Sequence, residues 1–236
     1  FDAEEIKAEE PAIDTRTVRG GIQYQDAYLI DNDSRFVFSF VRSAIEAGAA
    51  VANYIELVSA ERVATPQGDR WVARLRDVDS GEEFTTSART IVNAAGPFVD
   101  GLNRSWNNPT EHRIVYSKGI HLVVPRLTTT KHDRVLAFFD DTQRLFYLTP
   151  MGRRSVIGTT DTRIDTPFTA VDDDDRTFLL DQINARLDLP VPLTVADVIA
   201  ERSGVRPLVV KHDGGDQTDT DWTSLSRKHE IECDDE

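Results

Sequence analysis

A chain of 236 residues is long enough for one large domain or two small ones, and a hydrophobic fraction of 39% excludes global disorder. The formal net charge of −14, from 27 basic and 41 acidic residues, argues against a nucleic-acid binder and against a basic face held on anionic lipid. Cys233 is the single cysteine, so no internal disulfide can form, and an intracellular protein is the expectation. The sequence contains no run of 18 uncharged apolar residues, so no membrane-spanning helix is predicted.

The basic residues are five lysines and 22 arginines. Abundant Asp and Glu with scarce Lys predicts a protein adapted to high salt, where surface fields are screened within a few ångströms and negative charge maintains solubility. An ordinary acidic protein is the alternative. Because the chain begins at Phe1 without an initiator methionine and ends on acidic residues, we expect a piece excised from a longer protein.

The first half of the chain predicts the alternation typical of α/β packing. Residues 1–20 suggest a short helix or an ordered arm. A turn at Gly20-Gly21 precedes a predicted strand over 22–29. The acidic cluster at 31–34 is a helix start, and apolar residues at helical spacing continue the helix to Gly48. Strand, β-meander, buried strand and short helix are then expected over 49–58, 59–88, 90–95 and 98–106.

A second block begins near residue 107. Strands are predicted at 114–124, 135–139, 145–148, 155–158 and 225–231, with a short helix or strand at 195–199. The four aspartates at 172–175 precede apolar residues that share a helical face. A consecutive run of carboxylates does not converge on a metal ion, so these aspartates predict a solvated helix N-terminus.

The segment 203–208 places one arginine between a glycine and a proline. Gly204 permits a bend or a close backbone approach, and Pro207 pushes Arg206 toward an extended conformation. A guanidinium on a stiff backbone is suited to binding a carboxylate, a phosphate or a polarised oxygen. The alternative is an ordinary arginine at a strand end, in a surface ion pair.

The segment 118–121 carries a lysine and a histidine inside a predicted strand. On a regular strand, Gly119 and His121 share one face with Ser117, while Lys118 lies on the other. Gly119 leaves room for a planar group beside His121, which could accept a proton near neutral pH. A histidine that is simply hydrogen-bonded within the sheet is the alternative.

Two further segments end predicted strands. Residues 93–97, Asn-Ala-Ala-Gly-Pro, would let a ligand approach the backbone closely, or would form an ordinary tight turn. Residues 158–161, Gly-Thr-Thr-Asp, supply two hydroxyls and a carboxylate for a polar ligand, or cap their own turn. The sequence contains no G-x-G-x-x-G motif after a strand, no P-loop and no G-x-S-x-G elbow.

These motifs in this order are more specific than any one of them. Taken together, they closely resemble FAD-dependent, quinone-linked (aerobic type) glycerol-3-phosphate dehydrogenases; the segments concerned are 20–24, 31–35, 52–58, 93–97, 118–121, 158–161, 203–208 and 226–229. Members of that family begin with a glycine-rich turn for the FAD pyrophosphate and carry a late Gly-Gly-Lys motif. Neither is in this sequence, so it resembles a central fragment, in which FAD binding is expected to be weak or absent.

The resemblance implies an α+β (α/β) fold. A substrate-binding cap with an antiparallel or mixed sheet would accompany part of an FAD-binding domain of the glutathione-reductase or amino-acid-oxidase type. Residues 1–106 would belong to the FAD-binding domain, 107–205 to the cap, and 206–236 would return toward the FAD domain. The implied reaction is oxidation of sn-glycerol 3-phosphate to dihydroxyacetone phosphate, with hydride transfer to FAD and electrons passed to a quinone.

Roles for single residues follow from the same resemblance. Arg206 would polarise or anchor the substrate and His121 would help take the hydroxyl proton, with Lys118 and Thr160 as further substrate contacts. Ala95 and Gly96 would lie along the FAD, and Leu57 against its adenine. We expect a cytoplasmic location, and the sequence leaves open a peripheral contact at the inner face of the cell membrane and a homo-oligomer. A related amine or amino-acid oxidase, in which Arg206 would hold a carboxylate, and a non-catalytic domain are the alternatives.

Overall fold

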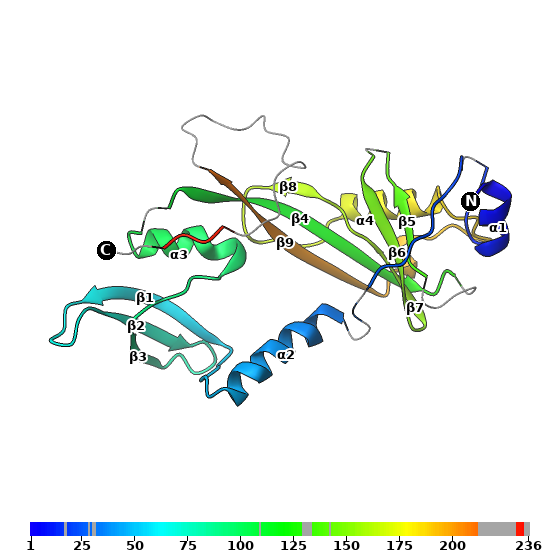
Figure 1. Cartoon of the computed structure of the whole chain (residues 1–236). Helices are drawn as coiled ribbons and strands as arrows, with labels where there is room; N and C mark the ends of the chain where they lie inside the picture. The colour runs from blue at the N-terminus through cyan, green and yellow to red at the C-terminus, as the bar shows by residue number, and fades with distance from the viewer. Residues whose placement is uncertain are drawn as a thin grey trace. The chain divides into compact units, whose positions relative to one another are not determined.

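The computed structural model describes residues 1–16, 18–27, 29, 32–108, 110–128, 134–141, 143–211 and 230–233 (Figure 1). By its internal contacts the chain divides into two compact units, the first formed by residues 1–23, 95–100 and 110–236 and the second by 24–94 and 101–109. Across the described ranges, no helix combines the length and apolar character needed to cross a membrane. The predicted division at residues 106 and 205, which separates FAD-binding and cap regions, stays a prediction.

The second unit contains the predicted helix and the β-meander. Its elements are α2 (Asn32–Glu46), β1 (Ile55–Val63), β2 (Arg70–Asp77) and β3 (Glu83–Ala88), and α3 (Val99–Ser105) ends in it. The three strands pair antiparallel in chain order. Asp77 closes the turn between β2 and β3, because its carboxylate accepts hydrogen bonds from the backbone N–H groups of Asp79 and Ser80, both at 2.9 Å.

The first unit is organised around one long strand, β4 (His112–Pro125). Its other strands are β5 (Leu136–Phe139), β6 (Leu145–Met151), β7 (Arg154–Gly158), β8 (Thr162–Ile164) and β9 (Ala200–Lys211). The sheet order is β5-β6-β7-β4-β8, and β9 pairs with β4 outside that path. Figure 1 shows β4 and β9 side by side, and their antiparallel register runs from His112 opposite Lys211 to Val123 opposite Ala200.

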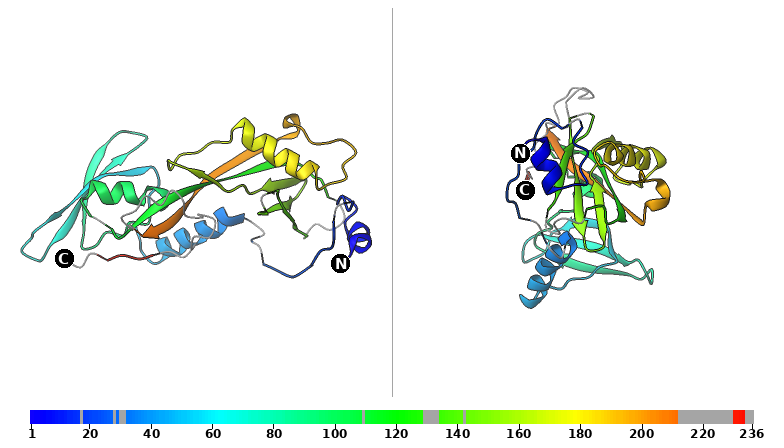
Figure 2. Two further views of the ribbon diagram at one scale, coloured as in Figure 1. Left: turned by 90° about the horizontal axis from the view of Figure 1, so that it is seen from above. Right: turned by 90° about the vertical axis from the view of Figure 1, so that its right-hand side faces the viewer.

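One face of this sheet is covered by α4 (Asp173–Asn184), as Figure 2 shows. Asp172 caps the helix together with Asp175 in a reciprocal capping box, and the acidic first turn complements the helix dipole. This confirms the helix start predicted at the four aspartates, but not that it is solvated, because Asp175 is buried and accepts a hydrogen bond from Lys118. The buried core joins apolar residues of α4, and Leu187 just after it, to those of the neighbouring strands. Its members are Ile120, Leu122 and Val124 of β4, Leu136, Phe146, Leu148 and Ile157 of β5–β7, and Leu179, Leu180, Ile183 and Leu187.

The remaining elements are short. Helix α1 (Ala3–Glu9) confirms the helix expected in the first twenty residues, with Asp2 and Glu5 forming its capping box. Two 3-10 helices, η1 (Gly96–Phe98) and η2 (Val195–Asp197), lie before α3 and before β9. Glu232 accepts hydrogen bonds from the backbone of Glu111 and His112, at 2.8 and 3.1 Å, beside the start of β4.

Several predicted strands are wrong. Residues 22–27 and 49–54 are not in strands, and β1 begins only at Ile55. Residues 90–95 form no strand, and Val92 is 84% exposed rather than buried. A buried strand needs neighbours at its edges and over its faces, and no described strand pairs with 90–95. Of the predicted strand at 225–231, residues 230 and 231 are irregular and the rest lie outside the described residues.

A candidate active site on the ladder of β4 and β9

Two of the predicted site residues, His121 and Arg206, lie on one face of the β4–β9 ladder. Ser117 lies opposite Arg206, Gly119 opposite Gly204, and His121 opposite Arg202. Because side chains alternate along a strand, all six residues point to the same face. The other face carries the buried Ile120 and Leu122 into the core under α4. The structure therefore brings His121 and Arg206 together, as the sequence predicts.

Arg206 is fixed by the turn that follows β7. Its Nη2 donates a hydrogen bond to Thr159 Oγ1 at 2.7 Å, and its Nη1 donates to the Thr160 carbonyl at 3.2 Å and to Asp161 Oδ1 at 3.3 Å. The side chain is still 34% exposed. These three contacts use part of the five guanidinium donors, which leaves the group able to bind an anion.

The position of Arg206 along the chain corrects one expectation. Arg206 lies inside β9 and not at a strand end, with Pro207 opposite Tyr116 in the ladder. Gly204 forms no bend and also continues the strand. The stiff, extended backbone that Pro207 predicts for Arg206 is confirmed, and it comes from cross-strand pairing as well as from the proline.

Asp161 joins β4 to the arginine. Its Oδ1 accepts a short hydrogen bond from the Ser117 hydroxyl as well as the bond from Arg206, and its carbonyl accepts a short bond from Arg144. Ser117 itself is fully buried. Thr159, Asp161 and Ser117 are functional candidates to which the sequence assigned no individual role. The signal was the pair of hydroxyls and the carboxylate at 159–161, but only the sheet register shows that they face Arg206.

His121 is held neutral by its surroundings. Burial is the main cause that lowers its pKa below 6.5, and the positive charges of Arg206 and Arg202 lower it further. A neutral imidazole near two guanidinium groups can accept a proton from a bound hydroxyl at neutral pH. The charge pattern thus favours the general-base role that the sequence predicts.

We expect His121 to make the fold less stable in acid. Because its pKa is lowered in the folded chain, the unfolded chain binds the proton more tightly, and stability falls as pH decreases below 6.5 toward the folded pKa. Above that window His121 contributes no pH dependence. Urea unfolding of wild type and His121→Gln at pH 7.5 and 5.5 checks this, because the variant should lose less stability between the two pH values. An equal loss in both proteins would contradict the prediction.

Lys118 points away from this face. Its Nζ lies 2.9 Å from Asp172 and 2.7 Å from Asp175, the two residues of the capping box of α4. Burial alone would lower the pKa of Lys118, but the hydrogen bonds and charges of Asp175 and Asp172 outweigh it and the pKa is raised. Lys118 therefore anchors α4 on β4, and its predicted contact with substrate stays a prediction.

Thr160 is buried and bonded within the protein. Its Oγ1 accepts a hydrogen bond from the Ile120 N–H at 3.1 Å, and its carbonyl accepts from Arg206. The hydroxyl therefore ties the turn to β4, next to the site rather than in the open part of it. Its predicted polar contact with substrate stays a prediction.

The predicted FAD contacts fall on both units. Leu57 lies half-buried in β1, at a register shift between Leu57 and Ser59. Ala95 and Gly96 belong to the first unit, where Gly96 has φ +54° and nothing lies within 4 Å of the place of a Cβ atom. The left-handed φ favours glycine, and the open backbone fits the close approach of a cofactor. Their contact with FAD stays a prediction.

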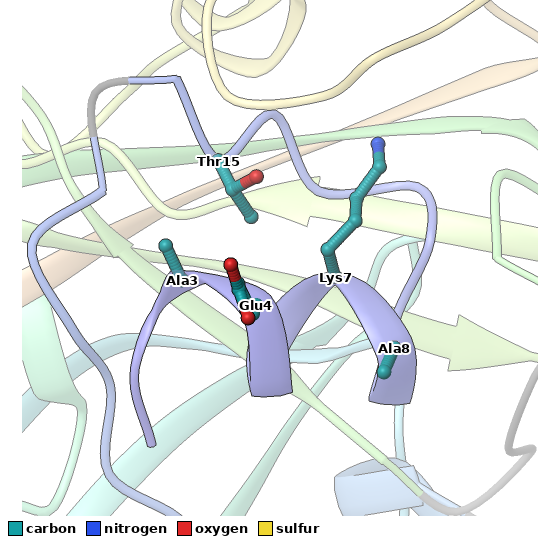
Figure 3. A pocket seen from close by; sticks show the side chains of 5 residues that line it. All are labelled: Ala3, Glu4, Lys7, Ala8 and Thr15. Atoms are coloured by element: carbon teal, nitrogen blue, oxygen red, sulfur yellow. The ribbon is translucent and has the colours of Figure 1, made fainter.

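A surface pocket lies elsewhere, beside α1 (Figure 3). It has a volume of 480 Å³ and is lined by Ala3, Glu4, Lys7, Ala8 and Thr15. Lys7 is already bonded to the Pro11 carbonyl at 2.8 Å and to Asp188 at 3.0 Å. The pocket includes none of the predicted site residues. Among the described residues no group of three or more His, Cys, Asp or Glu side chains could hold a metal ion.

Known proteins resemble this chain along most of its length. Among curated relatives, mitochondrial glycerol-3-phosphate dehydrogenase of Macaca fascicularis is 31% identical over 226 residues, which cover 94% of this chain and 30% of that protein. The mitochondrial glycerol-3-phosphate dehydrogenase of Arabidopsis thaliana is 32% identical over 219 residues, covering 92% and 33%. The chain thus spans about a third of the length of these relatives.

Solved structures show the same fold. The glycerol-3-phosphate dehydrogenase of Bacillus halodurans, complexed with FAD, matches with a TM-score of 0.75 at 24% identity, over 89% of this chain and 42% of that one. Glycine oxidase of Bacillus cereus matches with a TM-score of 0.63 at 20% identity, over 89% and 52%. The predicted fold class is confirmed.

The sequence profile of the family described as FAD dependent oxidoreductase matches residues 1–222. That match covers most of the chain, including the whole β4–β9 ladder. The resemblance that the ordered motifs predict is confirmed. The chain belongs to the family of FAD-dependent oxidoreductases.

Proposed function

We propose that this chain is the central part of a longer flavoenzyme that oxidises sn-glycerol 3-phosphate to dihydroxyacetone phosphate, with FAD as cofactor and a quinone as electron acceptor. The observation that carries the proposal is the face of the β4–β9 ladder, where Arg202 lies opposite His121 and Arg206 lies further along the same face, in a chain of net charge −14. Local positive charge in an acidic protein is the arrangement that a phosphate dianion requires. The relatives named glycerol-3-phosphate dehydrogenase add support.

The residues divide the chemistry between them. Arg206, with donors remaining beyond its bonds to the 159–161 turn, would bind the substrate oxygen on which negative charge develops. A neutral His121 would accept the proton of the C2 hydroxyl on a ring nitrogen. The chemistry that FAD would supply when bound is acceptance of the C2 hydride, so that one hydride and one proton would leave the alcohol as the ketone forms. Arg202 would add to the attraction for the phosphate.

The proposal extends to the surroundings of the enzyme. We place the longer protein in the cytoplasm or at the inner face of the cell membrane, where a quinone is accessible, as a peripheral protein or a homo-oligomer. The chain by itself would bind FAD weakly, because the glycine-rich turn of its family is absent from the sequence. The absorbance spectrum of the purified chain with added FAD measures directly whether the chain retains the flavin.

The second candidate is an FAD-dependent amine or amino-acid oxidase. The observation that favours it is the likeness in fold to glycine oxidase. Arg206 would then hold a substrate carboxylate, for which its planar donors are equally suited.

We expect the full-length protein to reduce an artificial electron-accepting dye in the presence of sn-glycerol 3-phosphate but not of glycine or other amino acids. The physical reason is that two guanidinium groups favour a dianion over a zwitterion, whose ammonium group they repel. The check is dye reduction by the full-length flavoprotein with each substrate at equal concentration. Turnover with amino acids alone would replace this proposal by the oxidase.

A further inference from the structure

Gly119 is crowded by the active-site arginine. A Cβ atom built at Gly119 would lie 2.5 Å from Arg206 Nη2 and 2.8 Å from both Cζ and Nη1. These distances are far inside van der Waals contact, so the guanidinium occupies the space that a side chain at this position would fill. The planar group for which the sequence shows room is therefore Arg206 itself.

Gly204 lies directly opposite Gly119 in the ladder and on the same face. A Cβ atom built at Gly204 would meet nothing within 4 Å. The two glycines pair with each other in the same sheet and on the same face, but only Gly119 has the Arg206 guanidinium next to it. Close approach is thus a property of Gly119, although the sequence pattern suggested it equally for Gly204.

We propose that Gly119 is a positioning residue of the active site. Because Gly119 has no side chain, the Arg206 guanidinium can lie against β4, within reach of the 159–161 turn and beside His121; we call this space beside Gly119 the seat. The role in turnover rests on the proposed function, whereas the seat itself rests on the geometry. Arginine has many rotamers, and the seat on one side and the bonds to Thr159 and Asp161 on the other select one of them.

The atoms that an added methyl group would meet are the far end of a flexible side chain. The backbone at Gly119 is not in the left-handed region, so alanine fits the strand without strain. Gly119→Ala should therefore leave the fold intact and move only the guanidinium. A shift of about 1 Å in such a group can lower the rate about 100-fold.

The test compares Gly119→Ala with the matched control Gly204→Ala in this chain. The pKa of His121 is followed by NMR titration, and folding by thermal unfolding. We expect Gly119→Ala to keep a melting temperature near wild type and to raise the His121 pKa toward 6.5, because the charge of Arg206 moves away while Arg202 stays. Gly204→Ala should leave the His121 pKa unchanged. An unchanged pKa in Gly119→Ala, or equal changes in both variants, would overturn the proposal.

A second comparison covers the case in which Gly119→Ala unfolds. In an Arg206→Ala background the crowding partner is gone, so adding Gly119→Ala should change neither the melting temperature nor the His121 pKa. Equal destabilisation in both backgrounds would mean that the backbone needs the glycine, and the seat would be refuted. In the full-length enzyme, kcat/KM should fall about 100-fold for Gly119→Ala. A full-length protein that does not turn over sn-glycerol 3-phosphate would overturn the proposed function, and full turnover in Arg206 variants would remove only the role of Arg206 in the reaction; in both cases the His121 titration still decides the seat.

Discussion

Replacing Arg206 by lysine in the full-length enzyme is expected to lower kcat/KM for sn-glycerol 3-phosphate about 100- to 1,000-fold. Lysine keeps the positive charge but not the fork of donors, so one ammonium group cannot bond Thr159, the Thr160 carbonyl and Asp161 and also face the substrate. Steady-state kinetics with a dye acceptor measure the loss. We expect it mainly in kcat, because the interaction strengthens as charge develops on the substrate oxygen.

The matched control is Arg74→Lys. Arg74 also lies on a strand and pairs with a carboxylate, Glu83 at 3.4 Å, but it is exposed and in the second unit. Its variant should retain wild-type kinetics. Wild-type kinetics for Arg206→Lys would show that Arg206 serves only the 159–161 turn, and a rise in KM alone would assign it to substrate binding without a part in the chemical step.

Replacing Lys118 by methionine is expected to lower the free energy of unfolding by about 3–5 kcal/mol, because the substitution leaves Asp175 charged and buried without its partner. The side chains of Lys118 and Asp175 are only 9% and 8% exposed. Urea unfolding followed by circular dichroism measures the change. The double variant Lys118→Met with Asp175→Leu should regain part of the loss, since it removes the unpaired charge as well.

Lys7→Met is the control for this second experiment. Lys7 forms a comparable bond to Asp188, at 3.0 Å, but the two side chains are 40% and 62% exposed. Exposed pairs of this kind contribute about 0–1 kcal/mol. A Lys118→Met variant with unchanged stability and a raised KM would contradict this prediction. It would instead support the substrate contact that the family resemblance implies for Lys118.

The sequence predicts what depends on neighbouring residues. The alternation of residues 117–121 and the aspartates before α4 were sufficient to predict β4, its two faces and the helix start. Local pattern also predicts the β-meander, because its turns carry glycine at Gly68 and Gly81, which adopt φ +100° and +76°. Each of these features is decided within a few positions along the chain.

Pairing between distant segments could not be predicted in this way. The sequence indicates a vacancy at Gly119 but not that Arg206 fills it, since this requires the β4–β9 register. For the same reason the sequence places Lys118 on the face opposite His121 but does not identify its partners, Asp172 and Asp175, which lie far along the chain at the start of α4. The apolar run at 90–95 predicts a strand, but a strand exists only where another pairs with it.

The β4–β9 ladder also couples correct strand register to the assembly of the candidate site. A slip of one residue along β9 would turn Arg206 to the opposite face together with the buried Leu208, which shares its face. A slip along β4 would exchange His121 with the buried Ile120 of the other face. Misaligned chains therefore lose the core and the active face in the same step. A chain that has folded stably has, by that fact, also assembled its arginine beside its histidine.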